Sequence, residues 1–219
     1  MATLTIKPTA AGNDVQIKSG DGNTTHATFG DTSTVNMSAG SIASAVTGTL
    51  GSGIVFPAGH IIQVVQGTDT TATTYTTSSF TNTPHSALNT SITPTSSTSK
   101  ILVTINASVA HHGPAGGTAH FKLARDPAGT PVYIAIGVAT GSVPAATFSM
   151  RLAEAHSMMH QTICYLDSPA TTSATTYGLM GALYGATGVN AYNMPSNTTT
   201  SDANMGRHMS IITLLEIAQ

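Results

Sequence analysis

The chain has 219 residues, of which only 7 % are charged, and its formal net charge is −2. An average globular protein has roughly 25 % charged residues, so this composition suits either a subunit of an assembly or a neutral soluble protein rich in Thr and Ser. The seven Lys and Arg residues form no basic stripe, which argues against a nucleic-acid partner.

A single cysteine, Cys164, excludes an intrachain disulfide. It lies in the apolar run 162–166, which predicts a buried, inert thiol rather than a nucleophile. Residues 1–4 lack the basic start and apolar core of a secretory signal. No apolar run approaches the roughly 18 residues of a membrane span. We therefore expect a protein that is made in a cytoplasm and does not insert into a membrane.

Residues 1–56 differ from the rest of the chain because their apolar side chains are few and widely spaced. Such a segment cannot bury enough apolar area to offset the entropy of ordering it. We expect it to be either disordered or an extended arm that neighbouring molecules hold in place. Ile42, Val46 and Leu50 recur every four residues, which allows a short helical turn.

From residue 57 onward, short apolar or Thr-rich runs alternate with Gly, Pro and Asp turn signals. This pattern predicts an all-β fold, and a jelly-roll-like antiparallel β-sandwich is the first choice. The expected strands cover residues 60–66, 70–80, 87–93, 100–109, 119–125, 131–137, 145–152, 158–166, 176–184, 189–192 and 208–218.

Three local features refine this prediction. Runs 176–184 and 189–192 are expected to form a hairpin around Gly185 and Gly188. Run 208–218 is apolar on both faces, which favours the centre of a sheet or a partner subunit. Between 158–166 and 176–184, the sequence Asp-Ser-Pro at 167–169 predicts a turn, because Asp and Ser bond turn backbone and Pro fixes φ.

Several segments of the chain carry a resemblance. They are FPAGHIIQV at 56–64, SITP at 91–94 with SKILV at 99–103, YLDSPATTSATTY at 165–177 and the final EIA at 216–218. Together they resemble a domain of marine tailed phages, notably those of cyanobacteria and related bacteria, that recurs in tail fibres and other virion proteins. The resemblance covers about residues 54–218, and its most specific part is the stretch 166–177.

The resemblance implies a homotrimeric virion component with a β-sandwich body, and it does not imply a catalytic site. It leaves open a head fibre, a decoration protein, a tail fibre and a tail tip, and the short chain favours a short fibre, a spike or a capsid decoration subunit. We expect residues 1–56 to be an extended N-terminal anchoring and oligomerisation arm and residues 57–219 to be the sandwich domain. The expected partners are copies of the chain and other capsid or tail proteins, since homo-oligomers usually close symmetrically.

No residue pattern predicts catalysis or a cofactor. The nine acidic residues are scattered, mostly in turns, without the paired carboxylates of a glycosidase. His156 and His160 lie four apart in an expected strand, roughly 13 Å from each other, which is too far to share a metal ion. We therefore expect no enzyme activity and no metal, and assign the nine histidines polar or interface roles.

The alternative function is a receptor-binding module that recognises a host surface glycan and so mediates host attachment. Sugar sites usually stack a ring on an exposed aromatic side chain, and the chain offers Tyr75, Tyr133, Tyr184 and Tyr192. Tyr184 and Tyr192 flank an expected loop, which makes them the best candidates for glycan contact. The competing interpretation places them in the core or in an interface.

Overall fold

The computed structural model describes residues 56–112, 117–151, 158–184, 188–195 and 206–219. The chain divides into two units, Met1–Ile54 and Val55–Gln219, and all the described residues belong to the second. The expected arm at 1–56, with its helical turn at residues 42–50, lies outside the described residues except for Phe56.

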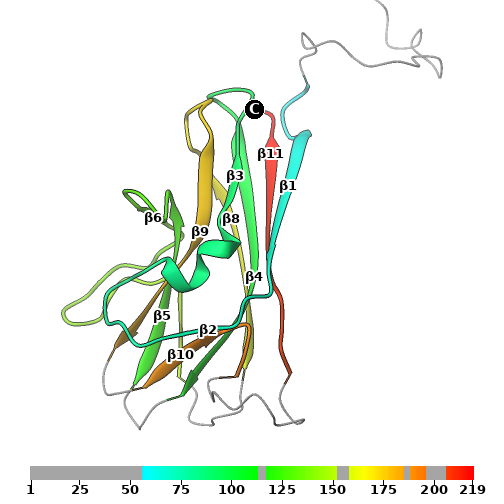
Figure 1. Ribbon diagram of the computed structural model, residues 1–219. Helices are drawn as coiled ribbons and strands as arrows, with labels where there is room; N and C mark the ends of the chain where they lie inside the picture. Colours follow the sequence, from blue (N-terminus) through cyan, green and yellow to red (C-terminus); the bar gives the residue numbers. More distant parts are fainter. Residues whose placement is uncertain (1–55, 113–116, 152–157, 185–187, 196–205) are drawn as a thin grey trace, which may run out of the picture. The chain divides into compact units, whose positions relative to one another are not determined.

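The described part of the chain is built from strands and one short 3-10 helix, with no α-helix (Figure 1). In chain order the elements are β1 (Ile61–Asp69), β2 (Thr73–Tyr75), η1 (Thr83–Leu88), β3 (Thr90–Ile92), β4 (Lys100–His112), β5 (Thr118–Arg125), β6 (Val132–Ile134), β7 (Phe148–Met150), β8 (Met159–Asp167), β9 (Thr175–Tyr184), β10 (Val189–Tyr192) and β11 (Ser210–Ile217).

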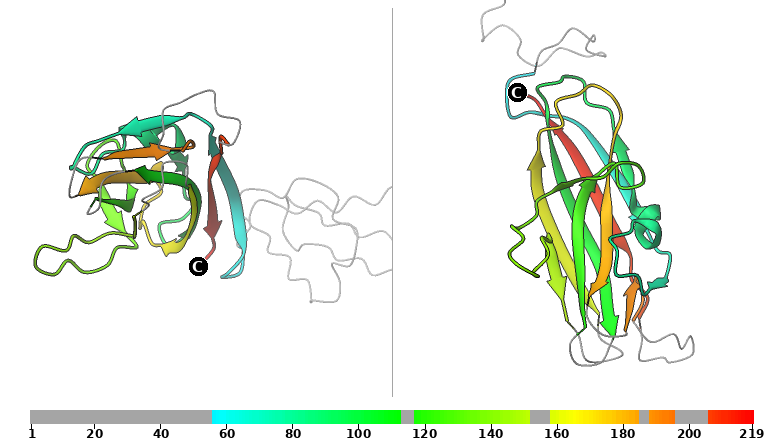
Figure 2. Two further views of the ribbon diagram at one scale, coloured as in Figure 1. Left: turned by 90° about the horizontal axis from the view of Figure 1, so that it is seen from below. Right: turned by 90° about the vertical axis from the view of Figure 1, so that its left-hand side faces the viewer.

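The strands form two antiparallel sheets, as the all-β sandwich prediction required. Sheet A has the order β1-β11-β4-β10-β2, with β8 also paired to β4, and sheet B has the order β3-β9-β5-β6, with β7 also paired to β5. The right-hand view of Figure 2 looks onto sheet B, with β5 and β9 in front and β11 behind.

Strand β4 organises sheet A because three strands pair with it. β11 pairs with its first half, Lys100–Asn106, and β10 pairs with its end, Val109–His112. β8 pairs with Ile101–Val109 and therefore lies along the opposite edge of β4. Strand β11 thus lies between β1 and β4, which confirms its predicted place inside a sheet.

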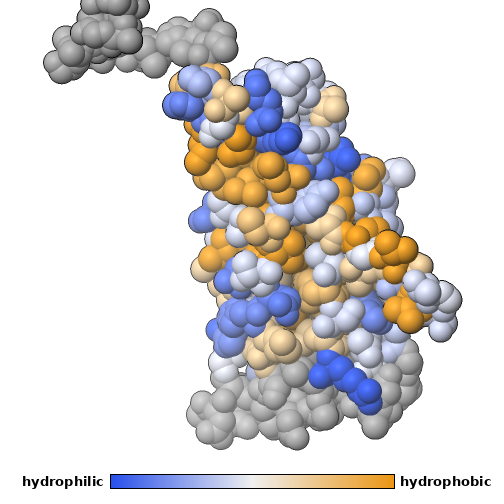
Figure 3. Space-filling model, turned by 180° about the vertical axis from the view of Figure 1, so that it is seen from behind, coloured by the Kyte–Doolittle hydropathy of each residue, from blue (hydrophilic) through white to orange (hydrophobic). Residues whose placement is uncertain are grey.

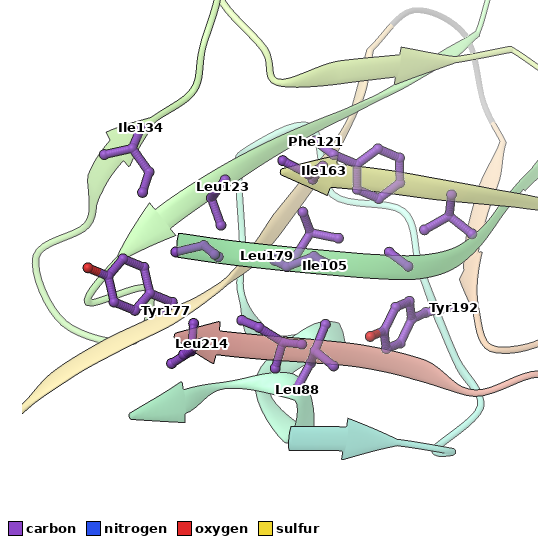
Figure 4. Packing of buried hydrophobic residues seen from close by; sticks show 14 of the residues in the cluster. Leu88, Ile105, Phe121, Leu123, Ile134, Ile163, Tyr177, Leu179, Tyr192 and Leu214 are labelled. Atoms are coloured by element: carbon purple, nitrogen blue, oxygen red, sulfur yellow. The ribbon is translucent and has the colours of Figure 1, made fainter. Parts of the chain in front are cut away.

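The core lies between the two sheets, where their inward side chains meet (Figure 4). In β4, Ile101, Val103 and Ile105 alternate inward and are fully buried. From sheet B, Phe121 of β5 stacks on Phe148 of β7 with ring centroids 4.5 Å apart. Each fully buried side chain of this size contributes roughly 1.5–3 kcal/mol relative to exposure.

The shorter elements depart from the predicted strands. Within 70–80 only Thr73–Tyr75 pairs, and the runs 131–137 and 145–152 shrink to three-residue strands. Helix η1 was not predicted. Its residues follow Asn82, whose side chain bonds Asn89 and the Leu179 carbonyl and so closes a compact loop. Thr-rich runs have strand propensity, but pairing partners decide how much of them becomes a ladder.

The predicted hairpin at 176–192 is wrong. Strand β9 pairs along its length with β5 in sheet B, whereas β10 pairs with β4 and β2 in sheet A. The chain therefore passes from one sheet to the other between these strands, as it does at the ends of a sandwich.

Candidate functional site

The outer face of sheet B carries a group of aromatic side chains. In β5 the core residues alternate with His120 and Lys122, which point outward. Tyr184 shares this face because it pairs with Thr118, two residues before His120. Tyr133 of β6 pairs with Ala124, two residues after Lys122. We call Phe80, His120, Lys122, Tyr133 and Tyr184 the aromatic platform.

Ring contacts hold the platform together. The Phe80 ring lies 6.2 Å from the Tyr133 ring and 6.2 Å from the Tyr184 ring, centroid to centroid. The His120 ring meets Tyr184 edge-on at 5.0 Å. Phe80 reaches this face because its neighbour Thr81 bridges Gly181 of β9. The platform therefore combines three segments that are far apart in the sequence.

The platform also holds a cation. The Lys122 Nζ atom lies 4.0 Å from the Phe80 ring centroid and 4.1 Å from that of Tyr133. Such cation–π contacts contribute about 0.5–2 kcal/mol each. Burial lowers the pKa of Lys122 from its ordinary value. Among the residues that the structure describes, the only ion pair joins Arg125 to Asp167, so no carboxylate there neutralises Lys122.

Tyr184 and Tyr192, the two tyrosines predicted to contact a glycan, lie in different parts of the structure. Tyr184 is 36 % exposed and belongs to the platform. Tyr192 is completely buried, with its ring 4.4 Å from that of His85, so it offers no surface to a sugar. The physical reason is register, since Tyr192 pairs with the buried Val109 on the inner face of sheet A. Sequence reasoning missed Phe80 and Lys122, which no local motif marks.

The histidines show a pairing that the sequence did not suggest. His160 of β8 stacks on His208, with ring centroids 4.8 Å apart and planes 6° from parallel. The His208 Nδ1 atom lies 3.0 Å from the Ser108 hydroxyl oxygen. His156 lies outside the described residues. Within the ranges the structure covers, no three His, Cys, Asp or Glu side chains gather as metal ligands would.

The prediction of a buried thiol at Cys164 is wrong, because its side chain is exposed. Cys164 pairs with Thr104 on the outer face of sheet A, and its neighbour Ile163 takes the buried position. An apolar run in an edge strand still alternates between solvent and core.

Asp167 does more than begin a turn. Its carboxylate accepts a hydrogen bond of 2.7 Å from the Tyr177 hydroxyl and lies 3.1 Å from the Arg125 Nε atom. Asp167 ends β8 in sheet A, whereas Tyr177 and Arg125 belong to sheet B. This polar group therefore ties the two sheets together.

A second surface lies on the outer face of sheet A. Four apolar residues stand in register across β1, β11, β4 and β8, namely Val64, Leu215, Leu102 and Leu166. We call them the apolar row. Val64 is 60 % exposed and Leu166 is 46 % exposed. Seen from behind in Figure 3, hydrophobic side chains gather in the upper part of the molecule.

On one side of the apolar row lie Ile217 and the charged Lys100, whereas the residues on its other side are uncharged. The next row in register consists of Gln66, Thr213, Thr104 and Cys164. Strand β8 pairs only with β4 among the described strands, so its other edge carries no further strand there. Unpaired edges with exposed apolar side chains favour association between molecules.

In the part of the chain that is described, no helix has the length and hydropathy needed to cross a bilayer. Compared with known proteins, the sequence matches no family model, and no curated protein matches it either.

Proposed function

We propose that this chain is a non-enzymatic structural subunit of a phage virion, a short fibre, spike or decoration protein. In this proposal residues 1–56 anchor the subunit to capsid or tail proteins, and a jelly-roll-like sandwich projects from the particle as part of a homotrimer. The resemblance of residues 54–218 to a domain of phage virion proteins supports this assignment.

The apolar row is the observation that carries the proposal. Its four side chains are contiguous and face solvent in one chain, and removing apolar surface from water contributes about 25 cal/mol per Å². A large exposed apolar patch marks an interaction surface more often than a free one. Copies of the chain are the favoured occupant because the resemblance implies a homotrimer, and because the row on one side, Gln66, Thr213, Thr104 and Cys164, is uncharged.

Light scattering coupled to size-exclusion chromatography tests this proposal. The unaltered chain should elute with three times the monomer mass of 22.2 kDa. Leu166→Lys should reduce the trimer, because a charge in the interface loses its hydration. Val143→Lys is the matched control, since Val143 is 63 % exposed on a loop. A stable monomer of the unaltered chain would overturn the assembly proposal.

Recognition of a host surface glycan is the second candidate function, and the aromatic platform favours it. Tyr184 presents ring area to solvent, while His120 bonds Ser149 at 2.6 Å and so supplies polar groups beside it. In saccharide titrations followed by NMR, Tyr184→Ala should weaken binding about ten-fold. Tyr165→Ala is the control, because Tyr165 is equally exposed, at 37 %, but lies on β8.

A further inference from the structure

We propose that the aromatic platform recognises an acidic saccharide, whose rings carry carboxylate or sulfate groups, and that Lys122 contacts the anion. This inference rests on the proposed glycan recognition and adds the chemical class of the ligand. Lys122 would be a specificity-determining residue within the platform.

The first reason is the uncompensated charge of Lys122. Its ammonium group has three N–H donors, yet its described contacts are the faces of Phe80 and Tyr133. Ring faces attract a cation but leave its net charge in place. The whole chain has only nine acidic residues, and none of those described forms an ion pair with Lys122. An anionic ligand would supply this missing partner.

The second reason is that the ammonium group is held in place. Two rings flank it at nearly equal distances, 4.0 and 4.1 Å, and the Phe80 ring also contacts Tyr184. A free surface lysine loses rotamer entropy when it binds a ligand, whereas a pre-ordered lysine loses less. The cation therefore lies on the same face as Tyr184, and the Phe80 ring contacts both residues.

The third reason is the division of roles across the platform. Burial lowers the pKa of His120 from its ordinary value, which favours its neutral form. Its ring and the Ser149 hydroxyl, 2.6 Å apart, suit the neutral hydroxyl groups of a sugar. Lys122 is the group of the platform that carries charge. Neutral hydrogen-bonding groups, an aromatic face and one cation together match a sugar ring with one acidic substituent.

The test compares matched ligands on the full chain. Oligogalacturonate carries carboxylates, its methyl ester has the same backbone without charge, and a sulfated galactan oligosaccharide carries sulfate. NMR titration should show oligogalacturonate or the sulfated galactan binding about ten-fold more tightly than the ester, as expected for a charged hydrogen bond. Rising salt should erase this preference.

Substitutions of Lys122 test whether this residue causes the preference for the acidic ligand over the ester. Lys122→Met should reduce binding of the acidic ligand to the level of the ester, whereas Lys122→Arg should keep the preference. Lys100→Met is the matched control because Lys100 lies at the start of β4 in the other sheet. Thermal unfolding of each variant reports whether it folds, and the salt titration of the unaltered chain tests the inference without any substitution.

The possible results distinguish recognition of an acidic saccharide from recognition of glycans in general. If oligogalacturonate and its methyl ester bind equally well, and both need Tyr184, the chain still recognises glycans. The inference that the ligand is acidic would then be wrong. No binding of any of the three saccharides would overturn both. A preference for acid that survives Lys122→Met in a folded variant would also overturn the role of Lys122.

Discussion

Among the described residues, four Asp, Glu and His side chains are buried, namely Asp69, His85, Asp167 and Glu216. Glu216 illustrates how they are accommodated. Burial acts to raise its pKa, but hydrogen bonds from Gln63 at 2.6 Å and from the Thr95 backbone N–H at 2.7 Å outweigh this effect and lower the pKa below its ordinary value. The shifted pKa values of His85 and Glu216 make the stability of the fold depend on their protonation states.

His85 predicts a loss of stability in acid. Burial lowers its pKa to about 3, whereas an unfolded histidine has a pKa of about 6.5. Between these values the unfolded chain binds the extra proton, so stability is complete above about pH 6.5. It then falls by about 1.4 kcal/mol per pH unit below that. In urea unfolding at pH 7 to 4, His85→Phe should flatten the slope.

The exposed His60 provides the control for this measurement. His60→Gln should keep the same pH slope as the unaltered chain, since its removal leaves the buried imidazole in place. Equal slopes for His85→Phe and the unaltered chain would contradict the assignment.

Asp167 predicts a cost for separating the sheets. Asp167→Asn removes the charge that pairs with Arg125, whose side chain is 26 % exposed, and weakens the acceptor of the Tyr177 hydroxyl. We expect the free energy of unfolding to fall by about 2 kcal/mol. Chemical denaturation measures it, and Asp126→Asn, at an exposed turn, should cost less than about 0.5 kcal/mol. Similar losses at both positions would argue against the inter-sheet link.

Among the elements, strand β9 packs closely at Gly181 against the segment 75–85. Gly181 bridges Thr81, and an added Cβ there would overlap the Tyr75 hydroxyl oxygen and lie 2.9 Å from the His85 Nε2 atom. A side chain at this position would push apart β9 and the segment that carries Phe80. Strand β9 is therefore packed against the 75–85 region as tightly as backbone allows.

Gly181→Ala should lower the free energy of unfolding by about 2 kcal/mol, because overpacking in a buried site forces neighbours to shift. Denaturation followed by circular dichroism measures this change. Gly137→Ala serves as the control, since the nearest atom to its added Cβ, the Ala146 carbonyl oxygen, lies at 3.8 Å. If both variants unfold at the same urea concentration, the close packing at Gly181 is not what positions β9.

At the scale of the whole molecule, the described unit Val55–Gln219 contains its own core between two sheets. Deleting residues 1–56 should therefore leave a folded sandwich with an unchanged far-ultraviolet spectrum. The truncated protein should no longer decorate virions in labelled imaging, because the proposed anchor is gone. Decoration by the truncated protein would contradict the anchoring role of this segment.

Local alternation and turn signals are enough to place most of the long strands. Ile101, Val103 and Ile105 alternate with partly exposed residues, and this local period of two is a property of the strand itself. Run 208–218 has apolar residues on both faces, which favours the centre of a sheet or a contact with a partner subunit. These features depend on neighbours within a few residues, so they can be read from the chain directly.

The identity of the side chains that meet depends on the tertiary fold. Tyr184 and Tyr192 look alike in the sequence, yet one lies on the outer face of sheet B and the other is buried inside sheet A. Cys164 is exposed because it lies on the outer face of sheet A, opposite Thr104, and Phe80 comes close to Lys122 because its neighbour Thr81 bridges β9. Burial and side-chain clusters depend on strand order and register between distant segments, and local periodicity carries no information about either.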